Sequence, residues 1–272
     1  MREALRICQP AEQDRPLLKQ IWTETFQDPP ELVERFFAFF PPEQSAWLVQ
    51  DCGRIVSTAY LLTGNRFVAG NQSAAAAYVY AVATPKEHRG KGYGSMLMRH
   101  FAQTSQNDGS ILYTRPASRE LFRWYEQSMH TKPAGFSREE TIRASGEPCV
   151  KPVKQMNGTA YGEMRERALA ETPHLVLSNP FLQLQEVFLN AENGGFYAVE
   201  NCCCACEYAE GEIFIKELLG PAEARCTAID SLIRRFHAKQ ARIRIPEPFS
   251  EPLVACCSEN DLTTTNWGLL LD

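Results

Sequence analysis

The chain has 272 residues, of which 44% are hydrophobic and 22% are charged, and its formal net charge is −5. This composition is ordinary for soluble globular proteins, and the length suits two domains. The negative charge and the lack of a basic block argue against nucleic-acid binding, and no run approaches the roughly 20 apolar residues that a membrane helix needs.

Compartment and cysteine usage are linked in this sequence. The amino terminus carries no apolar core of signal-peptide length, so we expect a cytoplasmic protein with no membrane partner. In a reducing compartment, the ten cysteines are expected to act mostly as small buried hydrophobes. The one cluster, Cys202–Cys206, lies in a predicted strand, whose neighbouring side chains point to opposite faces. We therefore favour packing over a zinc site and expect no metal.

The first predicted elements are two amphipathic helices. Apolar residues recur at helical spacing over Glu12–Thr25. A second helix starts at Asp28-Pro29-Pro30 and stops at Pro41-Pro42, because proline suits an early helical position and cannot continue a helix. These helices also carry three carboxylates, for which solvent exposure is the plain interpretation: Glu24, Glu31 and Glu34.

The next segment is rich in β-forming residues and turn signals. In order, it is predicted to contain strands Ala46–Gln50 and Arg54–Leu62 around the turn Asp51-Cys52-Gly53, a second turn at Gly64-Asn65, a short extended piece Phe67–Ala69, a loop Asn71–Ser73 and a central strand Ala76–Thr84.

A glycine-rich turn, Arg89-Gly90-Lys91-Gly92-Tyr93-Gly94, follows the central strand and opens a helix. The first N–H groups of a helix have no internal partner and carry partial positive charge. Glycines let the backbone approach a ligand and adopt positive φ, and Arg89 and Lys91 add two cations. The turn therefore predicts a site for a di- or polyphosphate.

The spacing of the glycines distinguishes between phosphate-binding motifs. Gly90, Gly92 and Gly94 do not fit the dinucleotide pattern G-x-G-x-x-G, and the P-loop pattern is absent. The pattern R-x-x-G-x-G fits as Arg89, Gly92 and Gly94. With the strand Ala81–Thr84 before it, this segment resembles the acetyl-CoA motif of the GNAT N-acetyltransferase superfamily.

The resemblance implies a mixed α/β (α+β) fold with a GNAT acetyl-CoA-binding catalytic domain over residues 1–145. It also implies acetyl-CoA as co-substrate and a small-molecule or peptide amine as acceptor. In such folds the central strand splays from its neighbour and its backbone pairs with the pantetheine arm, while the first helices line the acceptor cleft. The implied cofactor-binding positions are Val82, Ala83, Thr84, Arg89, Gly90, Lys91, Gly92, Tyr93, Gly94, Ser95 and Ser118.

Tyr125 is the predicted catalytic residue. We expect a helix from Gly94 to about Ser105, a strand Ser110–Thr114 and a helix Arg119–Ser128 that carries Tyr125. By resemblance, Tyr125 matches the tyrosine that gives a proton to the departing CoA thiolate, although the family's asparagine is here Ser118 and the route to Gly135-Phe136 is longer. A tyrosine that only packs its ring is the alternative. A positioned general acid is worth roughly 10²–10⁴-fold in rate.

The general base is not assigned by the sequence. Relatives often place a glutamate on the central strand, which here offers Tyr78 and Tyr80 instead. A water relay, Glu31 or Glu34, or a group from the second half of the chain remain open.

The second half repeats the first in weaker form. After a predicted strand Ser137–Ala144, the Pro- and Gly-containing stretch Ser145–Gly158 is interpreted as a linker. Three strands, a turn at Gly220-Pro221-Ala222, a helix and the strand Ala241–Ile245 follow. Since this turn lacks the arginine and the glycine series, we interpret residues 159–272 as a degenerate GNAT-like domain of structural role, as in tandem bacterial GNAT proteins.

The chain end, Asn266–Asp272, is apolar enough to predict a strand docked in a sheet. Some multidomain acetyltransferases that the chain resembles use their terminal carboxylate as a base, which makes Asp272 a hypothesis for that role.

Two function classes compete: an N-acetyltransferase that works by direct attack in a ternary complex, and a non-catalytic acyl-CoA sensor or scaffold. Oligomeric state has no signature in the sequence.

Overall fold

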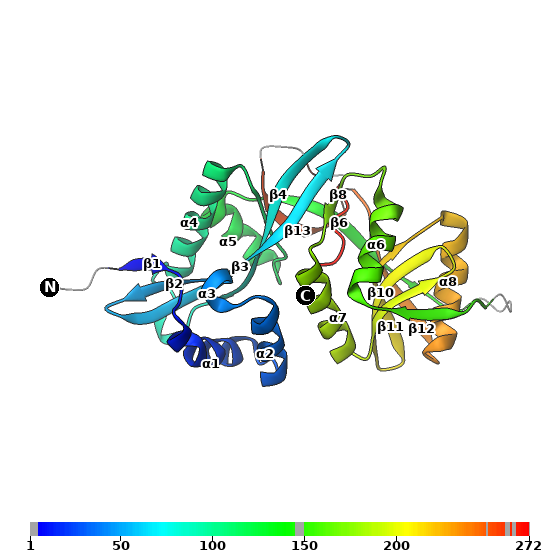
Figure 1. Ribbon diagram of the computed structural model, residues 1–272, viewed down its shortest axis with the longest axis horizontal. Coiled ribbons are helices and arrows are strands. Elements are labelled where there is room, and N and C mark those ends of the chain that lie inside the picture. The colour runs from blue at the N-terminus through cyan, green and yellow to red at the C-terminus, as the bar shows by residue number, and fades with distance from the viewer. Residues whose placement is uncertain (1–4, 145–149, 249, 259–261, 263–264, 272) are drawn as a thin grey trace.

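A computed structural model describes residues 5–144, 150–248, 250–258, 262 and 265–271. Two lobes lie side by side, the amino-terminal half in blue to green and the carboxy-terminal half in green to orange (Figure 1). Among the described residues, no helix has the length and apolarity to cross a membrane.

The two halves contribute comparable sets of elements. The first half contains β1 (Arg6–Cys8), α1 (Arg15–Phe26), α2 (Pro30–Phe39), α3 (Pro42–Ser45), β2 (Ala46–Asp51), β3 (Arg54–Ala69), β4 (Gln72–Ala83), α4 (Tyr93–Asp108), β5 (Ile111–Thr114), α5 (Arg119–Met129) and β6 (Lys132–Ile142). The second half contains β7 (Val153–Met156), α6 (Gly158–Leu169), β8 (His174–Val176), α7 (Asn179–Ala191), β9 (Gly195–Val199), β10 (Cys202–Ala209), β11 (Glu212–Leu219), α8 (Ala222–Arg235), β12 (Gln240–Pro246) and β13 (Glu251–Cys257).

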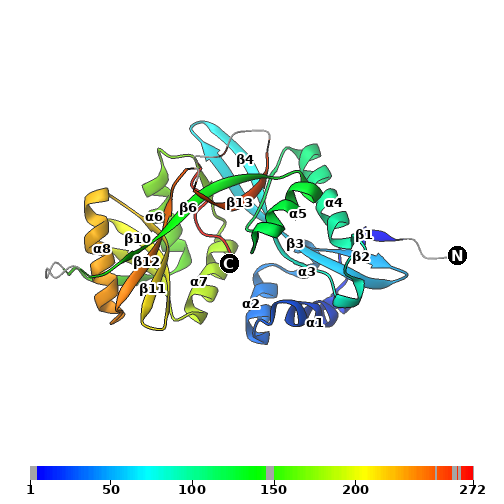
Figure 2. The same ribbon diagram turned by 180° about the vertical axis from the view of Figure 1, so that it is seen from behind.

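One sheet of 13 strands passes through both lobes in the order β1-β2-β3-β4-β5-β13-β6-β12-β11-β10-β9-β7, with β8 paired to β3. The pairs β4–β5 and β11–β12 are parallel, and each is joined by a helix. The late strand β13 lies between β5 and β6, and β6 reaches across to β12 (Figure 2). The predicted mixed α/β class is confirmed, whereas the division between residues 145 and 159 stays a prediction.

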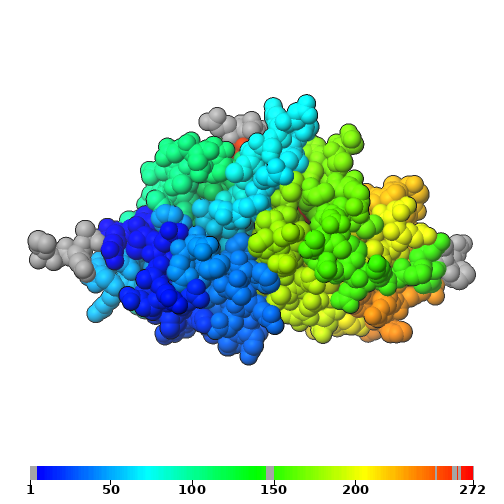
Figure 3. Space-filling view, in the orientation of Figure 1, coloured from blue at the N-terminus to red at the C-terminus, as the bar shows by residue number. Residues whose placement is uncertain are grey.

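Three hydrophobic clusters hold the sheet and helices together. One cluster lies under α4 and α5 and a second under α8. The largest joins α1, α2, α6, α7 and the carboxy-terminal segment. Because α2 also packs directly against α7, the blue and lime surfaces meet along a broad contact between the lobes (Figure 3).

Some sequence-based boundaries were wrong. The predicted turn at Gly64-Asn65 lies inside β3, where a register shift accommodates Gly64 at φ 99°. The Asn65 side chain is buried there and donates to the Tyr113 hydroxyl over 2.7 Å. The predicted loop Asn71–Ser73 is shorter, since β4 begins at Gln72. Part of the predicted linker forms β7, which pairs with β9.

The segment Asn266–Leu271 is docked, but it does not form a strand. Asn266 forms an isolated parallel bridge with His174, and Gly268 adopts φ 62°, which breaks the extended conformation. Trp267 and Leu269–Leu271 are buried. The Trp267 ring lies over Gly135, where an added Cβ would come within 2.2 Å of it. Gly135 therefore leaves room for this segment.

The cysteine cluster behaves as its strand periodicity predicts. Cys202, Cys204 and Cys206 pack into the cluster under α8, whereas Cys203 packs into the large cluster on the other face. Burial raises the pKa of the Cys203 thiol to about 12, which keeps it neutral as a packed apolar side chain.

Candidate active site

The parallel strands β4 and β5 separate after a short paired segment. Their register runs from Ala76–Ile111 to Tyr78–Tyr113 and stops there. Beyond it, Val79–Ala83 has β3 on one side and no paired strand among the described residues on the other. A bulge at Ala81, with φ 46°, bends the strand further. This separation opens a cavity of about 860 Å³.

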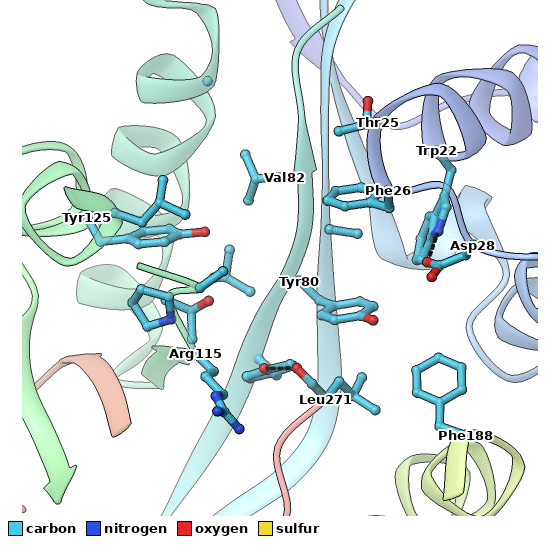
Figure 4. A pocket seen from close by; sticks show the side chains of 18 of the residues that line it. Trp22, Thr25, Phe26, Asp28, Tyr80, Val82, Arg115, Tyr125, Phe188 and Leu271 are labelled. Atoms are coloured by element: carbon cyan, nitrogen blue, oxygen red, sulfur yellow. Dashed lines mark hydrogen bonds between the residues drawn. The ribbon is translucent and has the colours of Figure 1, made fainter. Parts of the chain in front are cut away.

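The cavity connects the two faces of the sheet (Figure 4). Val82 and Tyr125 belong to the cluster under α4 and α5, and Trp22 and Tyr80 belong to the large cluster on the opposite face. In Figure 4, Tyr125 and Val82 lie to one side of β4, and Trp22 and Asp28 lie to the other. We name these the α5 side and the α1 side of the cavity.

The glycine-rich turn has the backbone that its sequence predicts. Gly90 and Gly92 adopt φ 76° and 81°, and an added Cβ at either would meet nothing within 4 Å. Gly92 is the N-cap of α4, and the first helical bond runs from the Met96 N–H to its carbonyl over 3.0 Å. Within the described part of the chain, the backbone N–H groups from Gly90 to Ser95 have no acceptor. They form a set of free donors that fits a pyrophosphate.

Side chains fix the strand end beside this turn. The Ser57 hydroxyl donates to the Ala83 carbonyl over 3.1 Å and lies 2.9 Å from the Thr84 hydroxyl. Arg89 Nε donates to the Thr84 carbonyl over 3.0 Å. An added Cβ at Gly94 would lie 3.3 Å from the Trp124 ring. Gly94 is therefore the glycine that permits close packing of α4 on α5.

The predicted cofactor positions fall into two groups. Val82, Thr84, Arg89 and Gly94 line the cavity. The others surround it without lining it. Ala83 is buried in the large cluster, and Gly90, Lys91 and Gly92 are exposed at the turn. The Tyr93 hydroxyl donates to Asp51 over 2.8 Å, Ser95 accepts from the Trp124 indole over 3.1 Å, and Ser118 caps α5.

Tyr125 lies on the α5 side with its hydroxyl directed into the cavity (Figure 4). Its ring packs against Trp124 with centroids 4.7 Å apart, and the residue is 7% exposed. Burial raises the pKa of Tyr125 to about 12, against a smaller opposing effect of a hydrogen bond with Thr114. The phenol therefore stays protonated at neutral pH and is able to donate a proton or a hydrogen bond.

The sequence did not single out several residues that line the cavity. Among them are Asp28, Arg115, Phe188 and Leu271. Asp28 accepts a hydrogen bond from the Trp22 indole over 2.7 Å. In sequence it appeared only as the residue before a helix-starting proline pair. Phe188 and Leu271 come from the second half, which no local pattern connects to this cavity.

The carboxylates of the first two predicted helices, of which Glu31 and Glu34 were considered as bases, are not at the cavity. Glu24, Glu31 and Glu34 do not line the cavity, whereas Asp28, Glu192 and Glu207 do. The Tyr78 hydroxyl donates to the Leu271 carbonyl over 3.0 Å, so the carboxy-terminal segment reaches the cavity. The hypothesis for Asp272 lies outside the described residues. The described part of the chain contains no group of three or more metal-ligating side chains.

Comparisons with known proteins agree with this geometry. A family model described as an acetyltransferase (GNAT) domain matches residues 6–126. A GCN5-related N-acetyltransferase from Kribbella flavida aligns with TM-score 0.70 and 17% identity over 93% of this chain and 71% of its own. One from Anabaena variabilis aligns with TM-score 0.73 and 14% identity over 94% and 73%.

Eis1 from Mycobacterium abscessus aligns with TM-score 0.66 and 14% identity over 96% of this chain and 72% of its own. No curated protein sequence matches the chain. At these identities the structural alignments show the shared fold, which extends over nearly the whole chain. We conclude that the amino-terminal half matches the GNAT acetyltransferase domain and that the chain shares the fold of GCN5-related N-acetyltransferases.

Proposed function

We propose that this chain is an acetyl-CoA-dependent N-acetyltransferase that acts on a primary amine of a small molecule or peptide. GNAT enzymes use acetyl-CoA as co-substrate, and the observation that carries the proposal is the row of free backbone N–H groups from Gly90 to Ser95 beside the cavity. In this proposal those groups bind the pyrophosphate. Arg89 and Lys91 add positive charge at the exposed turn, where it also raises the rate of encounter with an anionic co-substrate.

The unpaired edge of β4 supplies the second part of the proposed binding site. Val82, Ala83 and Thr84 lie where β5 has separated from β4. An extended pantetheine arm would lie along this edge like an added strand, because free backbone groups at a strand edge accept such a partner. Ser57 supports the site indirectly by holding the carbonyl of Ala83.

Tyr125 is proposed as the general acid. Transfer by direct attack brings the amine and the thioester together in one ternary complex. The C–S bond of the thioester breaks as the C–N bond forms, and the departing thiolate takes a proton from the Tyr125 hydroxyl. The proton that the amine loses passes to water, and water returns a proton to Tyr125. Backbone N–H groups near Val82–Thr84 are proposed to stabilise negative charge on the carbonyl oxygen. The raised pKa of Tyr125 keeps the proton available.

The second half is proposed to be a degenerate GNAT-like domain spanning residues 159–272, with residues 1–145 as the catalytic domain. Its β11–α8–β12 unit repeats the parallel β4–α4–β5 arrangement. The turn at Gly220-Pro221 is too short to wrap a pyrophosphate. Its proposed role is structural, since α7 and Leu271 close one side of the cavity. We retain the expectations of a cytoplasmic protein that uses no metal and binds neither nucleic acid nor membrane.

A non-catalytic acyl-CoA sensor is the second candidate, because β4 carries no carboxylate and Tyr78 is engaged by Leu271. Free-thiol release with acetyl-CoA and a panel of primary amines separates the two, together with equilibrium binding of acetyl-CoA. Amine-dependent thiol release supports the enzyme. Tight acetyl-CoA binding without release above solvent hydrolysis would replace it with the sensor.

A further inference from the structure

The α1 side of the cavity has aromatic walls. Trp22 and Phe26 come from α1, Tyr80 from β4 and Phe188 from α7. Trp22 is held by a ring contact with Tyr80, whose centroid lies 5.8 Å away. Figure 4 shows Asp28 and the Tyr80 hydroxyl on this side, with Phe188 below them. The cavity passes through the gap between β4 and β5. A molecule bound on the α1 side would therefore reach the α5 side from the opposite face of the sheet.

Asp28 is a fixed carboxylate with one oxygen available. Its Oδ2 atom accepts the Trp22 indole N–H over 2.7 Å, and Trp22 is only 3% exposed. Its Oδ1 atom has no hydrogen-bond partner among the residues that the structure describes. The carboxylate is therefore oriented by a buried ring and keeps a free acceptor at the cavity.

The Tyr80 hydroxyl is a second polar group on this side without a partner in the described part of the chain. Burial and the nearby charge of Asp28 raise the pKa of Tyr80, which stays protonated. A neutral phenol oxygen accepts a hydrogen bond from an ammonium group, and aromatic faces attract cations. Both features favour a positively charged guest.

The remaining charges on the α1 side do not reverse this preference. Glu192 adds an exposed carboxylate at the end of α7. Glu207 pairs with Lys216. Arg115 also lines the cavity, but Figure 4 shows it on the same side of β4 as Tyr125, and Glu207 is among the carboxylates that stabilise its charge. Asp28 is thus the lining carboxylate whose free oxygen lies among aromatic rings.

We propose that the acceptor carries a second positive charge, in addition to the amine that is acetylated, on an apolar body, and that Asp28, Tyr80 and Phe188 bind this second charge. The inference rests on the proposed acetyl transfer and names its substrate class. The reacting amine would reach the α5 side through the gap, while the second ammonium stays at Asp28. An acceptor with a carboxylate in that position would face Asp28 with like charge.

Three acceptors of equal chain length test this proposal: 1,5-diaminopentane, 1-aminopentane and 5-aminopentanoate. The protein should use the diamine with kcat/KM at least about tenfold above the monoamine, beyond the statistical factor of two, since hydrogen bonds to charged groups contribute about that much. The amino acid should be the poorest substrate. Equal use of all three, or preference for the amino acid, overturns the proposal.

Matched variants locate the effect. In Asp28→Asn, the side-chain oxygen still accepts the Trp22 N–H, and the preference for the diamine should disappear through a higher KM. Tyr80→Phe keeps the ring and should weaken the preference. Glu31→Gln, an equal charge change at an exposed residue of α2 outside the cavity, should leave it unchanged. A preference retained in Asp28→Asn contradicts the assignment.

Calorimetric titration of the diamine into the CoA-loaded protein separates this inference from the proposed function. If the wild type binds acetyl-CoA but releases no thiol with any amine, the transfer function fails. Diamine binding that is weakened about tenfold in Asp28→Asn would still uphold the charge site. Absent diamine binding, or binding that is equal in wild type and Asp28→Asn, overturns the charge site.

Discussion

Substitution of Gly92 by aspartate tests the proposal that the glycine-rich turn binds phosphate. Gly92 caps α4 with φ 81°, and a Cβ there would point into open space. A side chain at this position therefore meets no steric clash. Its cost to the fold is about 1–2 kcal/mol, because a residue with a Cβ is strained in the left-handed conformation. The new carboxylate would lie beside the free N–H groups that are proposed to hold the pyrophosphate.

The expected loss of affinity follows from charge repulsion. Two unit charges 4 Å apart interact by about 4 kcal/mol at an effective dielectric constant of about 20. Since each 1.4 kcal/mol is about a factor of ten in the dissociation constant, acetyl-CoA should bind roughly 10³-fold more weakly. Isothermal titration calorimetry measures this directly, and Gly92→Ala should lie between the wild type and Gly92→Asp because it adds strain without charge.

The other end of the same helix provides the matched control. Gly109 caps the carboxyl end of α4 with φ 72°, and an added Cβ at this position would also meet nothing within 4 Å. Gly109→Asp should lose a similar amount of stability to backbone strain but retain the affinity for acetyl-CoA. Affinity within about threefold of wild type in Gly92→Asp, or an equal loss in both variants, would refute the binding role of the turn.

Three further predictions concern the proposed catalytic tyrosine, the carboxy-terminal segment and the buried ion pair between Arg165 and Glu217. Tyr125→Phe should lower kcat about 10²–10⁴-fold with little change in KM, and an unchanged kcat removes Tyr125 from the mechanism. The pH profile of wild-type kcat should show no ionisation of this group near the usual tyrosine pKa of about 10, because burial raises the pKa of Tyr125 to about 12. Gly268→Ala should lower the free energy of unfolding by about 2–4 kcal/mol in urea denaturation, because its Cβ would lie 2.2 Å from Arg165 Nη2 at φ 62°. The control Gly70→Ala, at φ 56° in open space, should lower it by only about 1–2 kcal/mol. Equal losses in the two variants contradict the packing argument. Glu217→Gln removes the carboxylate 3.0 Å from buried Arg165 and should cost about 3–5 kcal/mol of unfolding free energy, and a loss below about 1 kcal/mol would show that this ion pair is not needed.

Local signals in the sequence predicted much of the fold and the conformation of the glycine-rich turn. The strand before Thr84, the glycine series and the start of α4 each depend on neighbouring residues, and the structure has them where they were expected. The alternation of Cys202–Cys206 between two clusters follows from strand periodicity alone.

Contacts between distant residues were the ones that the sequence could not predict. Gly64-Asn65 has the composition of a turn, but it lies inside a continuous strand. There the Asn65 side chain donates to the Tyr113 hydroxyl, 48 residues away, and accepts from the Ser178 N–H, 113 residues away. The place of β13 between β5 and β6 requires the whole chain. The role proposed for Asp28 depends on the Trp22 indole, which α1 places beside it.

The central claim is that the chain after Thr84 binds a pyrophosphate with its own backbone N–H groups. A crystal structure of the protein soaked with coenzyme A tests it most directly. We predict phosphate oxygens within hydrogen-bond distance of the N–H groups from Gly90 to Ser95, and the thiol in the gap between β4 and β5 near Tyr125. Coenzyme A bound in the carboxy-terminal half, or no nucleotide at the turn, would contradict the account.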